Sequence, residues 1–125
     1  MIKIFIVDDD QSLQRLYGLI LKEGGFEIID TAINGKDAVE KYKSLNVKPD
    51  LILMDHRMPI KNGLDAMKEI LKINKKEKII FASADITVKQ EALSLGACFF
   101  LDKPFKMQQL LITIQNLAKE LIVES

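Results

Sequence analysis

The chain has 125 residues, nearly half of them apolar, and its 18 basic and 18 acidic residues give a formal net charge of zero. This length and composition predict one soluble globular domain that buries about two-thirds of the surface of its unfolded chain. The balanced charge argues against a nucleic-acid or anionic-membrane partner, and the apolar runs are too short to span a bilayer. The amino terminus lacks a signal-peptide core, and the single cysteine, Cys98, gives no disulfide framework, so we expect a cytoplasmic protein.

The apolar pattern predicts five strands that alternate with five helices. The strands are short runs rich in apolar and β-branched residues, at 2–7, 26–33, 51–54, 78–82 and 98–101. Each is followed by apolar residues at helical spacing, within 13–21, 38–45, 64–71, 88–95 and 110–122. The apolar stripe of the first helix includes Leu16. Asp10 is expected to cap the amino end of this helix, and Gly24 is expected to end it. The helix at 87–95 has few apolar residues and is the weakest of the five.

This alternation predicts an α/β fold in which right-handed crossovers build a parallel sheet. We expect a flavodoxin-like (βα)5 three-layer sandwich with strand order 2-1-3-4-5. The chain shows no repeat, low-complexity tract or linker, so residues 1–125 are expected to form one domain.

The stretch at 50–63 is central to the argument. Residues 51–54 are all apolar, at the alternate positions that face the two sides of a strand. This is typical of a strand buried on both faces, and the run ends on Asp55. Pro59 and the pair Asn62-Gly63 then turn the chain. Asp55 is therefore expected at the carboxyl end of a central strand, the edge where open α/β sheets bind ligands.

Other polar residues are predicted at the same edge. The first, fourth and fifth strands end on Asp8-Asp9, Ser83 and Lys103, and carboxyl ends of parallel strands share one edge. Three clustered carboxylates raise one another's pKa unless a cation joins them, and oxygen-only ligands suit Mg²⁺. With a lysine charge and a serine hydroxyl added, the pattern predicts a cleft for a phosphoryl group with Asp55 as the acceptor.

Four short motifs carry a resemblance to a known family. They are Ile-Val-Asp-Asp-Asp at 6–10, Leu-Met-Asp-x-x-Met-Pro-x-x-x-Gly at 53–63, Ala-Ser-Ala at 82–84 and Lys-Pro-Phe at 103–105. In this order and spacing the chain resembles the receiver domain of two-component response regulators, and is similar to the stand-alone chemotaxis type. The resemblance covers essentially the whole chain.

The resemblance implies a role for each matching residue of the phosphorylation site. Asp55 would accept the phosphoryl group from a histidine kinase or phosphotransfer protein. Asp8 and Asp9 would hold Mg²⁺ together with Asp55 and the backbone carbonyl of Arg57. Lys103 would pair with the phosphoryl oxygens.

The resemblance also implies a switch. Ser83 would swing toward the phosphate, and its movement would free space for Phe100, the switch aromatic, to turn inward. The output surface would be the face made by the helix at 87–95, the strand at 98–101 and the helix at 106–122. Phe100 lacks the hydroxyl of the tyrosine that is common at its position.

Three further features lie near the expected site: the charges of Arg57 and Asp85, the side chain of His56, and the Lys103-Pro104 peptide bond. Arg57 and Asp85 fall two residues after the acceptor and the switch serine, positions that tune phosphate lifetime in the family, and their charges could pair over the site. His56 is interpreted as a strand-end residue that points away from the acceptor. The resemblance also implies that the Lys103-Pro104 peptide bond is cis, although most X-Pro bonds are trans.

We therefore expect a Mg²⁺-dependent signalling switch that assists its own phosphorylation and dephosphorylation and is not otherwise an enzyme. Its partners would be the phosphoryl donor and a downstream effector protein, with no direct contact to nucleic acid or membrane. The expected state is a monomer or a weak phosphorylation-dependent dimer.

Three alternatives share parts of the pattern. A haloacid-dehalogenase-like phosphohydrolase would use Asp8 as nucleophile in an Asp-x-Asp motif, but no acidic pair follows Lys103 and Asp55 would have no role. A flavin-binding domain would need hydroxyl and glycine residues where the first strand ends in acids. A pseudo-receiver would bind a partner without phosphorylation, against which the intact acceptor, acids and lysine argue.

Overall fold

The computed structural model describes residues 1–124, and side chains as far as residue 122. Within this range strands and helices alternate as the sequence predicts. The strands are β1 (Lys3–Val7), β2 (Glu27–Ala32), β3 (Leu51–Asp55), β4 (Ile79–Ser83) and β5 (Phe99–Asp102). The helices are α1 (Gln11–Glu23), α2 (Gly35–Ser44), α3 (Gly63–Ile73), α4 (Ile86–Leu95) and α5 (Met107–Glu124).

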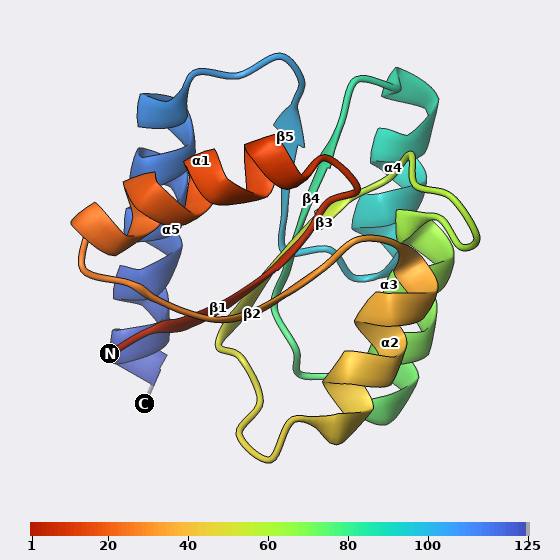
Figure 1. The fold of residues 1–125 in the computed structure, drawn as a ribbon, viewed down its shortest axis with the longest axis horizontal. Coiled ribbons are helices and arrows are strands. Elements are labelled where there is room, and N and C mark those ends of the chain that lie inside the picture. Colours follow the sequence, from red (N-terminus) through yellow and green to blue (C-terminus); the bar gives the residue numbers. More distant parts are fainter. Residues whose placement is uncertain (125) are drawn as a thin grey trace.

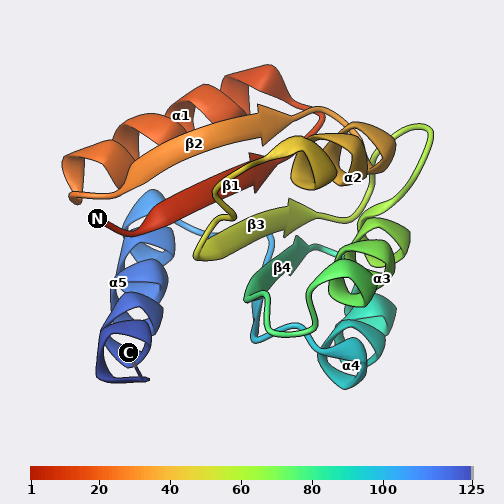
Figure 2. The ribbon, with the colours of Figure 1, turned by 90° about the horizontal axis from the view of Figure 1, so that it is seen from below.

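All strand pairs are parallel, and the sheet has the predicted order β2-β1-β3-β4-β5. Helices α1 and α5 cover one face of the sheet, and α2, α3 and α4 cover the other (Figures 1 and 2). The three-layer (βα)5 sandwich is thus confirmed. No helix of the described residues is long and apolar enough to cross a membrane.

Each face of the sheet has its own apolar core, because side chains of a strand point alternately to the two sides. In β3, Ile52 and Met54 pack with α2, α3 and α4, whereas Leu51 and Leu53 pack with α1 and α5. Every residue of β3 is buried, as expected for a central parallel strand. This strand therefore holds Asp55 on a rigid support.

Polar caps begin four of the helices immediately after the carboxyl edge of the sheet. The side chains of Asp10, Asn34, Asn62 and Asp85 accept hydrogen bonds from backbone N–H groups in the first turns of α1, α2, α3 and α4. Such caps satisfy donors that have no partner within the helix. They fix where each loop of the functional edge ends.

Of two packing expectations, one was wrong and the other is confirmed. Leu16 was placed in the buried stripe of α1, but its side chain is 41% exposed, and Gln14 takes a place in that stripe. The weak pattern of the fourth helix is confirmed, because only Val88 and Ala92 of α4 are buried. This helix is the most thinly packed of those on its face of the sheet.

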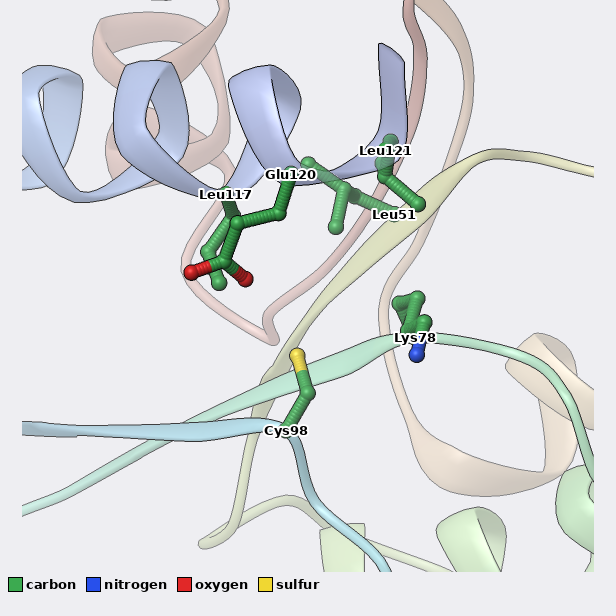
Figure 3. A pocket seen from close by; sticks show the side chains of 6 residues that line it. All are labelled: Leu51, Lys78, Cys98, Leu117, Glu120 and Leu121. Atoms are coloured by element: carbon green, nitrogen blue, oxygen red, sulfur yellow. The ribbon is translucent and has the colours of Figure 1, made fainter. Parts of the chain in front are cut away.

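Cys98 lies at the opposite, amino edge of the sheet. Its thiol faces a small cavity of about 60 Å³, which is also lined by Leu51, Lys78 and residues of α5 (Figure 3). Burial raises the pKa of the Cys98 thiol. The residue is half-buried beside the α1–α5 core, which agrees with its interpretation as a small packing residue.

Candidate functional site

The carboxylates of Asp8, Asp9 and Asp55 meet at the carboxyl edge of the sheet. Each offers an oxygen within 4.8 Å of the others. The approach follows from the sheet register, in which Val7 pairs with Met54, so that the residues ending β1 and β3 are neighbours. Asp8 and Asp55 are 3% and 8% exposed, and Asp9 faces solvent. The predicted cluster of three carboxylates is confirmed.

Lys103 contributes the positive charge of the site. Its Nζ donates a hydrogen bond to Asp55 Oδ1 at 2.9 Å and lies 3.6 Å from Asp8 Oδ2. Burial lowers the pKa of Lys103, but the hydrogen bond and the charges of Asp55 and Asp8 outweigh it, so the net pKa is raised. Lys103 is therefore a fixed cation, and its backbone N–H is held by the carbonyl of Ser83.

The site still carries more negative than positive charge. Burial raises the pKa of Asp8 to about 6, and the charges of Asp55 and Asp9 act in the same direction. The hydrogen bond from the Asp10 N–H and the charge of Lys103 lower this pKa but do not outweigh the burial. At neutral pH one lysine thus faces three carboxylates. Their donor atoms are all oxygens, which suits a hard divalent cation such as Mg²⁺ that binds one or two carboxylates and retains waters.

The loop after β3 is held close to Asp55. A side chain at Gly63 would collide with the carbonyl of Asp55, and the Gly63 N–H donates to the carbonyl of His56 at 2.9 Å. Ile60 has a φ of 70°, and the Lys61 N–H bonds to the Pro59 carbonyl across it. This backbone conformation is strained for a β-branched residue. The glycine of the Met-Pro-x-x-x-Gly motif is thus required by the close approach of the backbone.

Arg57 and Asp85 form the ion pair that the sequence suggested. An Arg57 guanidinium nitrogen lies 4.0 Å from Asp85 Oδ2, although the arginine side chain is 84% exposed.

The His56 ring packs against Phe81, and its buried Nδ1 has no hydrogen-bond partner. The Lys103-Pro104 bond is cis, as expected.

The proposed switch residues differ from expectation in one respect. Ser83 is buried, and its Oγ accepts a hydrogen bond from the Asp85 N–H at 3.0 Å. Phe100 was expected to turn inward only on activation, but its ring is already 7% exposed and stacks on Phe81 at a centroid distance of 6.0 Å. A phenyl ring has no hydroxyl to keep hydrated, so burial leaves no polar atom unsatisfied.

Sequence reasoning missed Gln14. Its amide nitrogen donates to the carbonyls of Asp8 at 2.6 Å and of Ala32 at 2.8 Å. The available signal was its spacing: residues 14, 17, 18 and 21 are the buried positions of α1, at intervals of three and four. A polar residue within such a stripe indicates a buried hydrogen-bond network.

The comparisons with known proteins agree with this geometry. Residues 4–115 match the model of the response regulator receiver domain. The chain belongs to this family. Receiver domains are phosphorylation-dependent signalling switches rather than classical enzymes, and the fold described above is that of a CheY-like receiver domain.

One sequence relative and two solved structures match this chain over most of their own length. The chain is 40% identical over 119 residues to the chemotaxis protein CheY of Thermotoga maritima, covering 94% of this chain and 98% of the relative. Among solved structures, the receiver is similar to the response regulator TrrA of Thermotoga maritima in complex with Mg²⁺ and BeF, with a TM-score of 0.82, 35% identity, and coverage of 94% and 99%. The CheX–CheY–BeF₃–Mg²⁺ complex of Borrelia burgdorferi matches with a TM-score of 0.87, 30% identity, and coverage of 93% and 88%.

Proposed function

We propose that this receiver accepts a phosphoryl group on Asp55 from a histidine kinase or a phosphotransfer protein. Mg²⁺ would be held by Asp8, Asp9, Asp55 and the backbone carbonyl of Arg57. The observation that carries the proposal is the direct 2.9 Å contact of Lys103 Nζ with Asp55 Oδ1 inside a cluster of three carboxylates. A solubilising or capping aspartate would need neither the half-buried lysine nor the neighbouring acids.

In the transfer, an oxygen of Asp55 forms a bond to phosphorus while the bond from phosphorus to the histidine nitrogen breaks. The imidazole leaves with its electron pair and is protonated. When bound, Mg²⁺ supplies positive charge that offsets the phosphoryl oxygens. Lys103 donates a hydrogen bond to Asp55 before the transfer and afterwards is in place to pair with a phosphoryl oxygen.

Phosphorylation adds a charge of about −1.5 to −2 and strong acceptor oxygens beside Ser83. The Ser83 Oγ accepts from the Asp85 N–H, so its own hydroxyl proton is free to be donated to the phosphoryl group. That donation would pull the β4–α4 loop and move α4, whose packing is thin. The face made by α4, β5 and α5 would then change its affinity for an effector protein.

The names of the relatives support the ligand and the partner class. TrrA was solved with Mg²⁺ and BeF, and CheY of Borrelia burgdorferi with CheX, BeF₃ and Mg²⁺. We carry over to this chain the Mg²⁺ ion and a protein effector, and we further propose a cytoplasmic site of action. The proposal also treats residues 1–125 as one receiver domain and includes assistance by the site in hydrolysis of the aspartyl phosphate.

The direct test is to incubate the protein with Mg²⁺ and acetyl phosphate and to record its intact mass beside an Asp55→Asn variant. One added phosphoryl group on the native chain, lost in the variant and on chelation of Mg²⁺, is the expected result. An adduct that survives Asp55→Asn would transfer the acceptor role to another residue, with Asp8 the first candidate. No adduct under any condition would favour a receiver that acts without phosphorylation.

A further inference from the structure

Gln14 holds the loop that carries Asp8. The residue is buried on α1, and its single amide nitrogen uses both hydrogens, one on the carbonyl of Asp8 and one on the carbonyl of Ala32. These two carbonyls end neighbouring strands, β1 and β2. One neutral side chain thus joins α1 to the carboxyl ends of two strands.

The bonds fix Asp8 from both sides of its Cα atom. Its backbone N–H donates to the carbonyl of Ala32 at 3.0 Å, and its own carbonyl accepts from Gln14. The Ala32 carbonyl therefore accepts two hydrogen bonds, one from each partner. With the peptide groups on both sides held, the direction of the Cα–Cβ bond of Asp8 is set before the carboxylate meets any ligand.

The carboxylate then has few remaining degrees of freedom. Its Oδ1 accepts from the Asp10 N–H at 2.9 Å, and its Oδ2 lies 3.6 Å from Lys103 Nζ. We propose that Gln14 is a positioning residue that acts through Asp8 to preorganise the Mg²⁺ site. This inference rests on the proposed function, because it assumes that Asp8 is a Mg²⁺ ligand. Groups that orient metal ligands through hydrogen bonds typically contribute 10- to 100-fold to metal affinity.

A substitution of Gln14 is expected to leave the chain folded. The side chain lies beside a cavity of about 360 Å³ between α1 and β2, lined also by Arg15, Gly18, Leu19 and Ile28. Water from this cavity can hydrate the two carbonyls when the amide is lost. Such water does not impose one orientation on the loop, so the expected defect is in the preorganisation of Asp8.

The test compares Mg²⁺ binding by isothermal titration calorimetry in the native protein, Gln14→Met and Leu21→Ala. Methionine keeps the size of glutamine without its donors. Leu21 is fully buried on the same helix and contacts the core away from Asp8, so its truncation is a matched control for loss of stability. We expect Gln14→Met to weaken Mg²⁺ binding by about tenfold. Leu21→Ala should lower Tm and change the Mg²⁺ affinity by less than about twofold.

A second readout separates positioning from chemistry. In Gln14→Met, the Mg²⁺ concentration for half-maximal phosphorylation by acetyl phosphate should rise by about tenfold, with the rate at saturating Mg²⁺ near that of the native protein. If Gln14→Met folds poorly, Gln14→Asn serves instead, because its shorter amide cannot reach both carbonyls.

The outcomes are distinct. Native Mg²⁺ affinity in Gln14→Met or Gln14→Asn, with only Tm lowered, would show that Gln14 has a purely structural role and would overturn the inference. Failure of the native protein itself to bind Mg²⁺ would overturn the proposed metal site, and with it the role of Gln14. Weakened binding in Gln14→Met but not in Leu21→Ala supports the inference.

Discussion

Among single side chains, Lys103 determines the charge balance of the proposed phosphorylation site. Its Nζ contacts Asp55 Oδ1 and lies near Asp8 Oδ2, so it competes with a divalent cation for the same carboxylates. Removal of a unit charge about 4 Å away changes an interaction by about 1–4 kcal/mol, depending on the local dielectric. We predict that Lys103→Met binds Mg²⁺ at least about fivefold more tightly than the native protein, as measured by calorimetric titration.

The same variant should lose the response to phosphorylation, because no cation would then pair with the phosphoryl oxygens. Amide NMR spectra with and without beryllofluoride and Mg²⁺ would show smaller shifts on α4 and β5 than in the native protein. A suitable control is Lys106→Met, which alters an exposed lysine near the same loop. Equal or weaker Mg²⁺ binding in Lys103→Met would contradict the competition argument.

The Arg57–Asp85 pair is a second feature at the scale of side chains, and we expect it to restrict the access of water to the acceptor. The two groups lie 4.0 Å apart, and the side chain of Arg57 is 84% exposed to solvent. Exposed pairs contribute about 0.2–1 kcal/mol, so their effect on a rate is modest. We predict that Arg57→Ala shortens the lifetime of the aspartyl phosphate by about 1.5- to 5-fold.

The lifetime can be followed by intact mass after removal of the phosphodonor. Arg15→Ala provides a matched control, because Arg15 is an exposed arginine on α1 away from Asp85. An unchanged lifetime in Arg57→Ala would mean that the pair does not restrict water at the phosphate.

At the level of elements, α4 is the segment best suited to move. Its buried side chains are Val88 and Ala92, whereas α3 buries Leu64, Met67 and Ile70 among others. A helix with little buried apolar surface opens at low free energy. We predict that amides of α4 exchange with deuterium faster than amides of α3, and that beryllofluoride with Mg²⁺ changes exchange in α4 more than in α3. Equal protection of both helices, measured by mass spectrometry, would contradict a switch centred on α4.

The elements themselves were predictable because local signals agree with the fold. Alternating apolar runs and helical stripes gave the order of strands and helices, and Asp10 and Gly24 marked the ends of α1 as expected. The strand ends also gave the cluster of Asp8, Asp55 and Lys103, since parallel strands share one carboxyl edge. These features depend only on the spacing of apolar residues along the chain and on the order of the strands and helices.

Other features depend on how particular side chains pack, and the sequence did not show them. Gln14 replaces Leu16 in the buried stripe of α1 because two strand-end carbonyls need donors at that point. Phe100 lies inward because Phe81 offers it a stacking surface. Neither fact follows from residue type or spacing without the positions of the neighbouring chains.

For the molecule as a whole, the two edges of the sheet have different roles. The carboxyl edge holds the proposed phosphorylation site, and the amino edge is closed by a buried polar network. There the Tyr42 hydroxyl on α2 donates to Glu77 Oε2 at 2.7 Å, and the Asn74 amide donates to Tyr42 Oη at 3.2 Å. Burial and the hydrogen bond to Glu77 raise the pKa of Tyr42 to about 12, so the hydroxyl remains a donor. The network fastens α2 to the loop that precedes β4.

The stability of the whole fold should depend on pH through Glu77. Burial raises the pKa of this carboxyl above 4.5, against hydrogen bonds from Tyr42 and the Lys78 N–H. The native state therefore binds more protons than the unfolded state above pH 4.5, and the stability contribution of Glu77 is lost as pH rises through its native pKa.

In Glu77→Gln, which keeps an acceptor for Tyr42, this loss is absent. We predict that the free energy of unfolding of Glu77→Gln, relative to the native protein, increases from about pH 4 to pH 7 in urea titrations. The same substitution at the exposed Glu23 should show no such trend, and a constant difference for Glu77→Gln would mean that its carboxyl titrates alike in the folded and unfolded chains.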